Sequence, residues 1–269
     1  MRTRVIVGVA LLVMLLALLY FGGYVYLGVL TLFSLAAVYE MQLAFRKKGY
    51  APLMAPVYAF AALYPWIYYF AGTELLVGVY LLALLVTASL IVFRKNGAIT
   101  DAIVTLFLFV YPLTFAMATL LVYFAFDRPT GLVAACMALF APEVCDMFAY
   151  FAGTLFGKRK LCPSISPKKT VEGSIGALVG GLVFSVILIL VEPLWGGSVP
   201  AVALLALGLV CGVFSQLGDL FASMIKRWAE IKDFSSVFPG HGGILDRIDS
   251  ILFCAPAVLV TFMALTKLG

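Results

Sequence analysis

Long apolar stretches follow one another along most of the chain, and charged residues or glycines separate them. A helix that crosses a bilayer needs roughly 20 mostly apolar residues, so the pattern predicts an all-α, polytopic transmembrane helix bundle of about nine spans. We predict the helices at Val5–Phe21, Tyr24–Phe45, Pro52–Phe70, Leu75–Phe93, Ala102–Phe126, Gly131–Phe156, Ser174–Val191, Val199–Ile225 and Ile244–Leu265. Pro112 predicts a kink in the fifth helix. Two polar loops, Gly157–Gly173 and Lys226–Gly243, interrupt the series.

Composition agrees with this pattern and excludes a soluble domain. Hydrophobic residues make up 64% of the 269 residues and charged residues only 12%, whereas soluble domains are about 45–50% apolar and about 25% charged. No long polar linker divides the chain, so we expect one continuous bundle. Within it we separate residues 1–130, with the first five helices, from a catalytic part, residues 131–269, with the last four helices and both polar loops.

The distribution of basic residues sets the predicted topology. With a cytoplasmic N-terminus, all of the 18 lysines and arginines except Arg128 and Lys267 fall on cytoplasmic segments, as the positive-inside rule requires. Both polar loops then face the cytoplasm. The net charge of +5 therefore reflects membrane topology, and we expect no nucleic-acid partner.

Carboxylates inside or beside apolar helices are the candidates for chemistry, because ionisable groups there are costly and usually functional. Glu143 and Asp146 are three residues apart and share a helix face, as do Asp246 and Asp249. Asp219 lies in the eighth predicted helix, where no cap position or adjacent partner is visible. Oxygen-only ligands suit Mg²⁺ and not zinc, so these residues predict a magnesium site.

Structural roles remain open for several of these residues. Each aspartate could instead cap a helix or pair with an arginine, as Asp246 could with Arg247. His241 is as consistent with structural hydrogen bonding as with catalysis. The flexible pair Gly242–Gly243 suggests backbone that approaches a ligand closely. For Glu40, near the basic end of the second helix, we predict a structural role only.

Two stretches resemble the phosphatidate cytidylyltransferase (CDP-diacylglycerol synthase) family. The first runs from Ser223 to Asp249 and contains SMIKR, then KD, then PGHGGILDRID, with no departure from the family pattern. The second runs from Asp146 to Gly173 and contains DMFAY, FGK and SPKKTVEG. The resemblance covers about the C-terminal half of the chain. The first five helices match the family only in their general apolar character.

The resemblance implies a reaction in phospholipid biosynthesis: CTP and phosphatidic acid give CDP-diacylglycerol and pyrophosphate, with Mg²⁺ and possible use of a second cation. It implies a multi-pass protein of the bacterial inner membrane whose active site faces the cytoplasm and opens sideways to the lipid bilayer. On this basis Asp219 and Asp246 are the expected principal metal ligands, and Asp249 and Asp146 would either bind the ion directly or hold those ligands in place. Asp219, Asp246, Lys226 and Arg227 are the expected catalytic residues; Lys226 and Arg227, with Lys168, Lys169 and Arg247, would hold phosphates. Ser166, Thr170, Ser223, His241, Gly242 and Gly243 complete the expected substrate-binding set.

Other functions remain as alternatives. A CTP-dependent kinase of a polyprenol or another lipid alcohol would use similar residues, but it would also need a base for a neutral hydroxyl. A transporter would place its carboxylates near the bilayer midplane, in repeated halves, and the chain shows no repeat. A homo-oligomer is possible.

Overall fold

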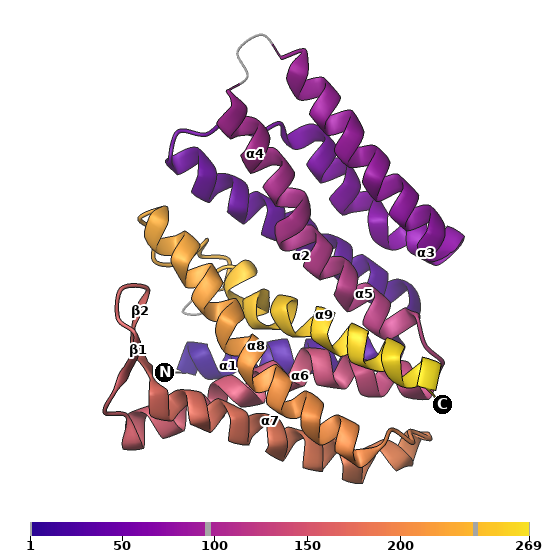
Figure 1. The fold of residues 1–269 in the computed structure, drawn as a ribbon, viewed down its shortest axis with the longest axis vertical. Coiled ribbons are helices and arrows are strands. Elements are labelled where there is room, and N and C mark those ends of the chain that lie inside the picture. The colour runs from indigo at the N-terminus through magenta and orange to yellow at the C-terminus, as the bar shows by residue number, and fades with distance from the viewer. Residues whose placement is uncertain (1, 95–97, 239–241, 269) are drawn as a thin grey trace. The chain divides into compact units, whose positions relative to one another are not determined.

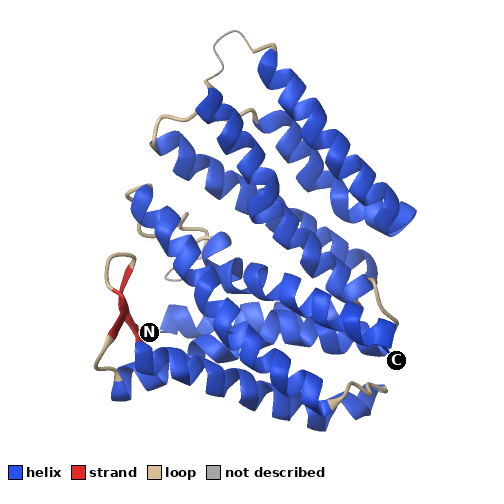
Figure 2. Cartoon of the chain, viewed as in Figure 1, coloured by secondary structure: helices blue, strands red, loops and turns tan. Residues whose placement is uncertain are grey.

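The computed structural model describes residues 2–94, 98–238 and 242–268, which form helices, their connections and one short hairpin (Figure 2). The elements in chain order are α1 (Arg2–Phe21), α2 (Gly23–Lys47), α3 (Met54–Val92), α4 (Ile99–Leu108), the π-helix η1 (Phe109–Thr114), α5 (Phe115–Phe124), α6 (Arg128–Phe156), β1 (Lys160–Cys162), β2 (Ser166–Thr170), α7 (Val171–Val191), the 3₁₀ helix η2 (Glu192–Trp195), α8 (Ala201–Trp228) and α9 (Leu245–Leu268), as labelled in Figure 1 where room allows.

The prediction of a helical membrane bundle is confirmed. Within the described ranges, seven helical runs are long and apolar enough to cross a membrane: α2, α3, α6, α8 and α9, the run from α4 to α5, and α7 extended through η2. The described apolar part of α1, Gly8–Phe21, is shorter. The count of nine spans and the cytoplasmic N-terminus stay predictions.

The predicted helix limits agree with the structure to within about three residues. The third and fourth predicted helices both lie in α3, and they meet across a kink at Gly72, whose φ of 78° and ψ of −176° are not helical. Glycine adopts this positive φ without the steric cost that a side chain would bring. The predicted kink at Pro112 is also confirmed, because η1 contains this proline and Tyr111 leaves the helical region.

The chain forms two compact units. The first comprises Met1–Leu120 and Trp228–Asp246, and the second comprises Leu121–Arg227 and Arg247–Gly269. Most of the second polar loop therefore belongs with the N-terminal helices by its contacts, although α8 and α9 flank it in the sequence. The functional division at residue 130 stays a prediction.

Buried hydrogen bonds join the helices of the first unit. The Ser34 and Tyr64 hydroxyls lie 2.8 Å apart and link α2 to α3. The Tyr26 hydroxyl donates to the Thr119 carbonyl at 2.9 Å and links α2 to α5. In an apolar surrounding each of these polar groups needs a partner, so the bonds fix which faces of α2 meet its neighbours.

Small residues bring α6 and α7 of the second unit into close contact. A Cβ atom on Gly176 would lie 2.7 Å from the Phe148 carbonyl oxygen, and one on Gly180 would lie 2.9 Å from the Val144 carbonyl oxygen. Glycine is the residue that permits two backbones to approach so closely. Gly176 and Gly180, four residues apart, thus serve packing within one chain and bring α7 against α6.

Candidate functional site

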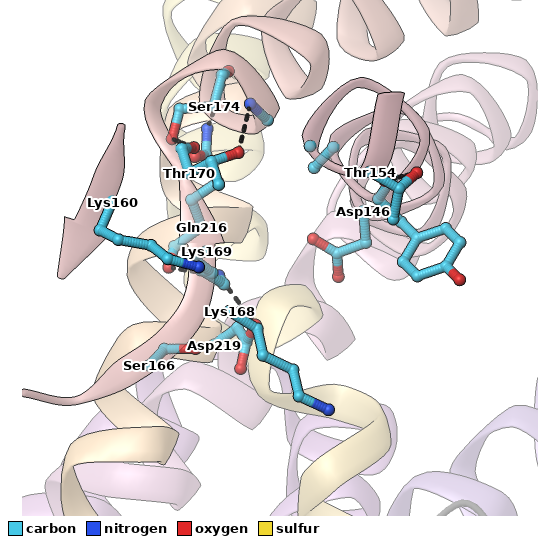
Figure 3. Close-up of a pocket in the computed structure, with 14 residues that line it drawn as sticks. Asp146, Thr154, Lys160, Ser166, Lys168, Lys169, Thr170, Ser174, Gln216 and Asp219 are labelled. Atoms are coloured by element: carbon cyan, nitrogen blue, oxygen red, sulfur yellow. Dashed lines mark hydrogen bonds and ion pairs between the residues drawn. The ribbon is translucent and has the colours of Figure 1, made fainter. Parts of the chain in front are cut away.

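The second unit contains a cavity of about 530 Å³ whose wall carries both lysines and carboxylates (Figure 3). The wall comes from α6, the hairpin, the first turn of α7, and α8. The predicted site residues that line it are Asp146, Ser166, Lys168, Lys169, Thr170 and Asp219. Figure 3 shows Asp146 on α6 across from the hairpin lysines and Asp219.

The hairpin was predicted only as a basic loop, and its strands were missed. Lys160 pairs with Thr170 and Cys162 with Ser166 in an antiparallel register. The Glu172 carboxylate fastens its base, because it accepts hydrogen bonds from the Lys158 and Arg159 amides at 3.0 and 3.2 Å. The side chains of Lys158, Arg159 and Lys160 are exposed. The hairpin therefore holds cations at the edge of the cavity.

Thr170 ends the second strand and begins α7. Its hydroxyl oxygen accepts a hydrogen bond from the Gly173 amide at 3.1 Å, which makes it the N-cap of that helix. The same threonine is 7% exposed and lines the cavity. Its hydroxyl therefore has a structural role, and the predicted contact with substrate remains a prediction.

Asp219 forms an ion pair with Lys169, a partner that the sequence pattern did not reveal. The Lys169 Nζ atom lies 2.8 Å from Asp219 Oδ2, and the two side chains are 21% and 34% exposed. The Ser223 hydroxyl donates to Asp219 Oδ1 at 3.2 Å. The hydrogen bond places Ser223, predicted to bind substrate, next to the predicted metal ligand on α8.

Further carboxylates of the second unit interact with Asp219 electrostatically. The negative charges of Asp219 and Asp146 both act on Asp249, and the Lys226 ammonium opposes them. Asp146 also receives a hydrogen bond from the Ser250 hydroxyl at 3.2 Å. Cations therefore stand among the carboxylates, as expected for a group of like charges near one another.

Magnesium was expected among these carboxylates, and their chemistry fits it. Asp146, Asp219 and Asp249 supply oxygen donors only, which is the ligand set that a hard cation prefers. In the part of the chain that the structure describes, however, no three His, Cys, Asp or Glu side chains lie close enough together to hold a metal ion. The donors fit the ion by type, and the magnesium site stays a proposal.

The predicted phosphate-binding cations differ in their surroundings. Arg227 Nε donates to the Ile165 carbonyl at 3.3 Å and links the end of α8 to the hairpin turn. Arg247 interacts electrostatically with Glu143, and its buried Nε finds no hydrogen-bond acceptor among the described residues. A buried donor without an acceptor is uncommon, and a phosphate oxygen would supply the acceptor for Arg247.

Asp246 belongs to the first unit, where backbone amides hold its carboxylate. Its Oδ2 atom accepts hydrogen bonds from the Phe234 and Gly243 amides, both at 2.9 Å. Gly242 has φ 82°, and a Cβ atom there would lie 2.8 Å from Asp246 Oδ2. The chain's own carboxylate thus explains this glycine, whereas its predicted ligand contact stays a prediction. His241 lies outside the described residues.

Five polar residues of the cavity wall were not among the predicted site residues: Tyr150, Thr154, Lys160, Ser174 and Gln216. Gln216, one turn before Asp219 on α8, donates to the Ser174 carbonyl at 3.3 Å, and Tyr150 lies one turn after Asp146 on α6. Helical spacing of three or four residues from each aspartate was the available signal. Applied to both helices, it would have found Gln216 and Tyr150.

The comparisons with known proteins agree with the resemblance described above. The model of the cytidylyltransferase family matches residues 2–265. The chain is similar to the phosphatidate cytidylyltransferase of Bacillus subtilis, with 51% identity over 41% of this chain and 40% of the relative. It is also similar to that of Staphylococcus haemolyticus, with 40% identity over 50% of each. These alignments span half or less of the relatives' length.

A mycobacterial relative extends the similarity to the N-terminal helices. The phosphatidate cytidylyltransferase of Mycobacterium bovis is 30% identical over 100% of this chain and 89% of its own length. The match of the family model and this alignment both include the helices that resembled the family only in character. The chain belongs to the cytidylyltransferase family.

Proposed function

We propose that the protein transfers a cytidylyl group from CTP to phosphatidic acid and releases pyrophosphate. The observation that carries this proposal is the cavity whose wall brings hairpin lysines together with the Asp146 and Asp219 carboxylates, in a chain of this family. Both substrates are anionic, and cations must offset their repulsion before they react. The apolar helices on which this site is built would let a lipid headgroup enter from the bilayer, at the cytoplasmic face of a bacterial inner membrane.

The reaction requires one bond to form and one to break. A phosphate oxygen of phosphatidate bonds to the α-phosphorus of CTP, and the bond from that phosphorus to the bridging oxygen breaks, with its electron pair leaving on pyrophosphate. Phosphatidate is ionised at neutral pH, so the attacking oxygen needs no general base. Lys168 and Lys169 would bind phosphate oxygens, and Arg247 would offer its buried Nε to another.

We expect Asp219, with Asp146 and Asp249, to hold Mg²⁺ in the second unit, and Asp246 stays a predicted ligand from the resemblance. When bound, the ion would stabilise negative charge on the transferring phosphoryl group and the leaving group. Lys169 would then exchange its bond to Asp219 for one to phosphate, because the carboxylate would face the metal. Ser223, which donates to Asp219, would orient that carboxylate.

The test is an assay of the purified protein in nanodiscs with CTP labelled at the α-phosphate, Mg²⁺ and phosphatidate. We expect label in CDP-lipid and release of one pyrophosphate for each lipid formed. The Asp219→Asn variant, which keeps the size of the side chain and removes its negative charge, is the control. Diacylglycerol or a polyprenol in place of phosphatidate tests the kinase alternative. Formation of CDP and a lipid phosphate from either alcohol, with no CDP-lipid from phosphatidate, would refute the proposal.

A further inference from the structure

Glu40 is a carboxylate within α2 that the proposed mechanism does not use. It is 1% exposed, and its hydrogen-bond partners come from the far end of the chain. The Ser235 hydroxyl and the Ile244 amide donate to Oε1, the amide at 2.9 Å, and the Leu245 amide donates to Oε2 at 2.7 Å. All of these residues belong to the first unit. Both carboxylate oxygens of Glu40 are therefore occupied by neutral donors.

The two amides are the ones that the start of α9 leaves without a helical partner. The first amides of a helix have no carbonyl four residues earlier to accept from them, and α9 begins at Leu245. Aspartate or serine at the N-cap normally supplies the acceptor. Here Glu40 does so from another helix, and its negative charge also suits the positive end of the α9 dipole.

Asp246 is the next residue after this cap. Its carboxylate takes the Gly243 amide while Glu40 takes the two amides that follow. Three successive amides are thus satisfied by two carboxylates, and the backbone that leads directly into Asp246 is held by all three bonds. Gly243 leaves room for this arrangement, because a Cβ atom there would overlap the Glu40 carboxylate.

The C-terminal end of α2 also contacts the second polar loop, Lys226–Gly243, near its start. Lys47 Nζ donates to the Glu230 carbonyl at 2.9 Å, and Lys48 Nζ lies 2.6 Å from Glu230 Oε1. The hydrogen bond from Lys48, with its charge, lowers the pKa of Glu230. The Phe45 and Trp228 rings are 5.5 Å apart. The two lysine contacts are exposed and individually weak, whereas Glu40 is buried.

We propose that Glu40 is a positioning residue for the cytidylyl transfer: it fixes the start of α9 and, through it, the direction of the Asp246 carboxylate. The inference rests on the proposed function, in which Asp246 is a predicted metal ligand. It goes beyond the structural role predicted from the sequence, because loss of Glu40 would change catalysis in molecules that remain folded.

The first test compares Glu40→Gln with wild type. Glutamine keeps the size but replaces one acceptor oxygen with an amino group, so one α9 amide faces a donor. We expect kcat to fall about 10–100-fold, the loss typical of residues that orient metal ligands. KM for CTP and phosphatidate should change less than about threefold, because Glu40 touches neither substrate. Hydrogen exchange of a peptide that spans Gly242 to Asp246 should become faster.

A second readout uses no substrate. Mg²⁺ should raise the thermal midpoint of the wild-type protein, since an ion that binds only the folded state stabilises it, and Glu40→Gln should lose most of this shift. The matched control is Ser34→Ala, which removes another buried hydrogen bond of α2. We expect it to lower the thermal midpoint while kcat per folded molecule and the Mg²⁺ shift stay at wild-type values.

A steric pair keeps the inference testable if Glu40→Gln does not fold. Gly243→Ala adds a Cβ atom where the Glu40 carboxylate lies, and Glu40→Asp withdraws that carboxylate by one methylene. Each single variant should lose activity, and the double variant should recover at least tenfold over the product of the two single effects. Effects that simply multiply would overturn the steric part of the inference.

The outcomes separate the inference from the proposed function. Wild-type protein that makes no CDP-lipid refutes the proposed function, and with it a catalytic role for Glu40. Wild-type activity together with an unchanged kcat, Mg²⁺ shift and exchange rate in Glu40→Gln refutes the inference alone. A Glu40→Gln variant that resembles Ser34→Ala, with lower stability only, also overturns it.

Discussion

Replacing Lys169 with methionine should destabilise the protein through the carboxylate that it leaves behind. Lys169→Met keeps most of the length of the side chain and removes its ammonium, which lies 2.8 Å from Asp219 Oδ2. Breaking a buried ion pair costs about 3–5 kcal/mol, and an exposed pair contributes about 0–1 kcal/mol. With side chains 21% and 34% exposed, we expect a loss of about 1–3 kcal/mol in the free energy of unfolding.

The negatively charged neighbours of Asp219 determine the sign of the coupling energy that we expect in a double-mutant cycle. Asp146 and Asp249 interact unfavourably with the Asp219 charge. An unpaired carboxylate at position 219 should therefore destabilise the folded protein more than a neutral amide does. Lys169→Met with Asp219→Asn should therefore be more stable than Lys169→Met alone. We expect a coupling energy of about 1–2 kcal/mol, well above the additivity error of about 0.5 kcal/mol.

The assay is thermal unfolding of the four proteins in one detergent. In a chain of this size each kcal/mol shifts the midpoint by about 2–4 °C, so the coupling should be measurable. Additive effects within about 0.5 kcal/mol would show that the ion pair contributes nothing to stability. A Lys169→Met protein as stable as wild type would refute the assumption that Asp219 stays charged without its partner.

Three further predictions concern the packing of α7 on α6, the start of α7 and the proposed Mg²⁺ ligands. Gly176→Ala should lower the free energy of unfolding by about 1–3 kcal/mol, as overpacking does, because the added Cβ atom would contact the α6 backbone. Its control is Gly78→Ala, which has open space around it and should be neutral or slightly stabilising in the same thermal-unfolding assay. Thr170→Ala should cost about 1 kcal/mol through loss of the α7 cap, and Thr170→Ser should restore most of it. In a Mg²⁺ titration of CDP-lipid synthesis, Asp219→Asn should lose most activity, and the activity of Asp249→Asn should fall roughly 10–100-fold. A variant whose Mg²⁺ dependence equals that of wild type would show that its residue is not part of the site.

The helices were predictable because each apolar stretch carries its own evidence. Length and hydropathy suffice for a spanning helix, and proline marks a kink without reference to the rest of the chain. The sequence also predicted two helices on either side of Gly72. The structure agrees, because this residue leaves the helical region and two helices meet there across a kink.

Contacts between distant residues could not be predicted in this way. Lys169 and Asp219 are 50 positions apart, and no spacing rule links a hairpin residue to a helix face. The hairpin itself was missed because its short strands, five residues at most, have no apolar alternation. The composition of the cavity was nonetheless predicted in part, since Asp146, Asp219 and both hairpin lysines, Lys168 and Lys169, were among the expected site residues.

The N-terminal helices show how a segment with little motif character can still support a site. They resembled the family only in general character, and the sequence suggested no task for them. Yet the loop that contains much of the strongest motif belongs by its contacts to the same unit as these helices, and α2 supplies the acceptor for the first amides of α9. A motif read along the chain lists groups that act on substrate, but it omits the distant residue that holds their backbone in place. Replacing α2 with another apolar helix of equal length should therefore preserve membrane insertion and abolish catalysis, and restoring glutamate at position 40 should recover part of it.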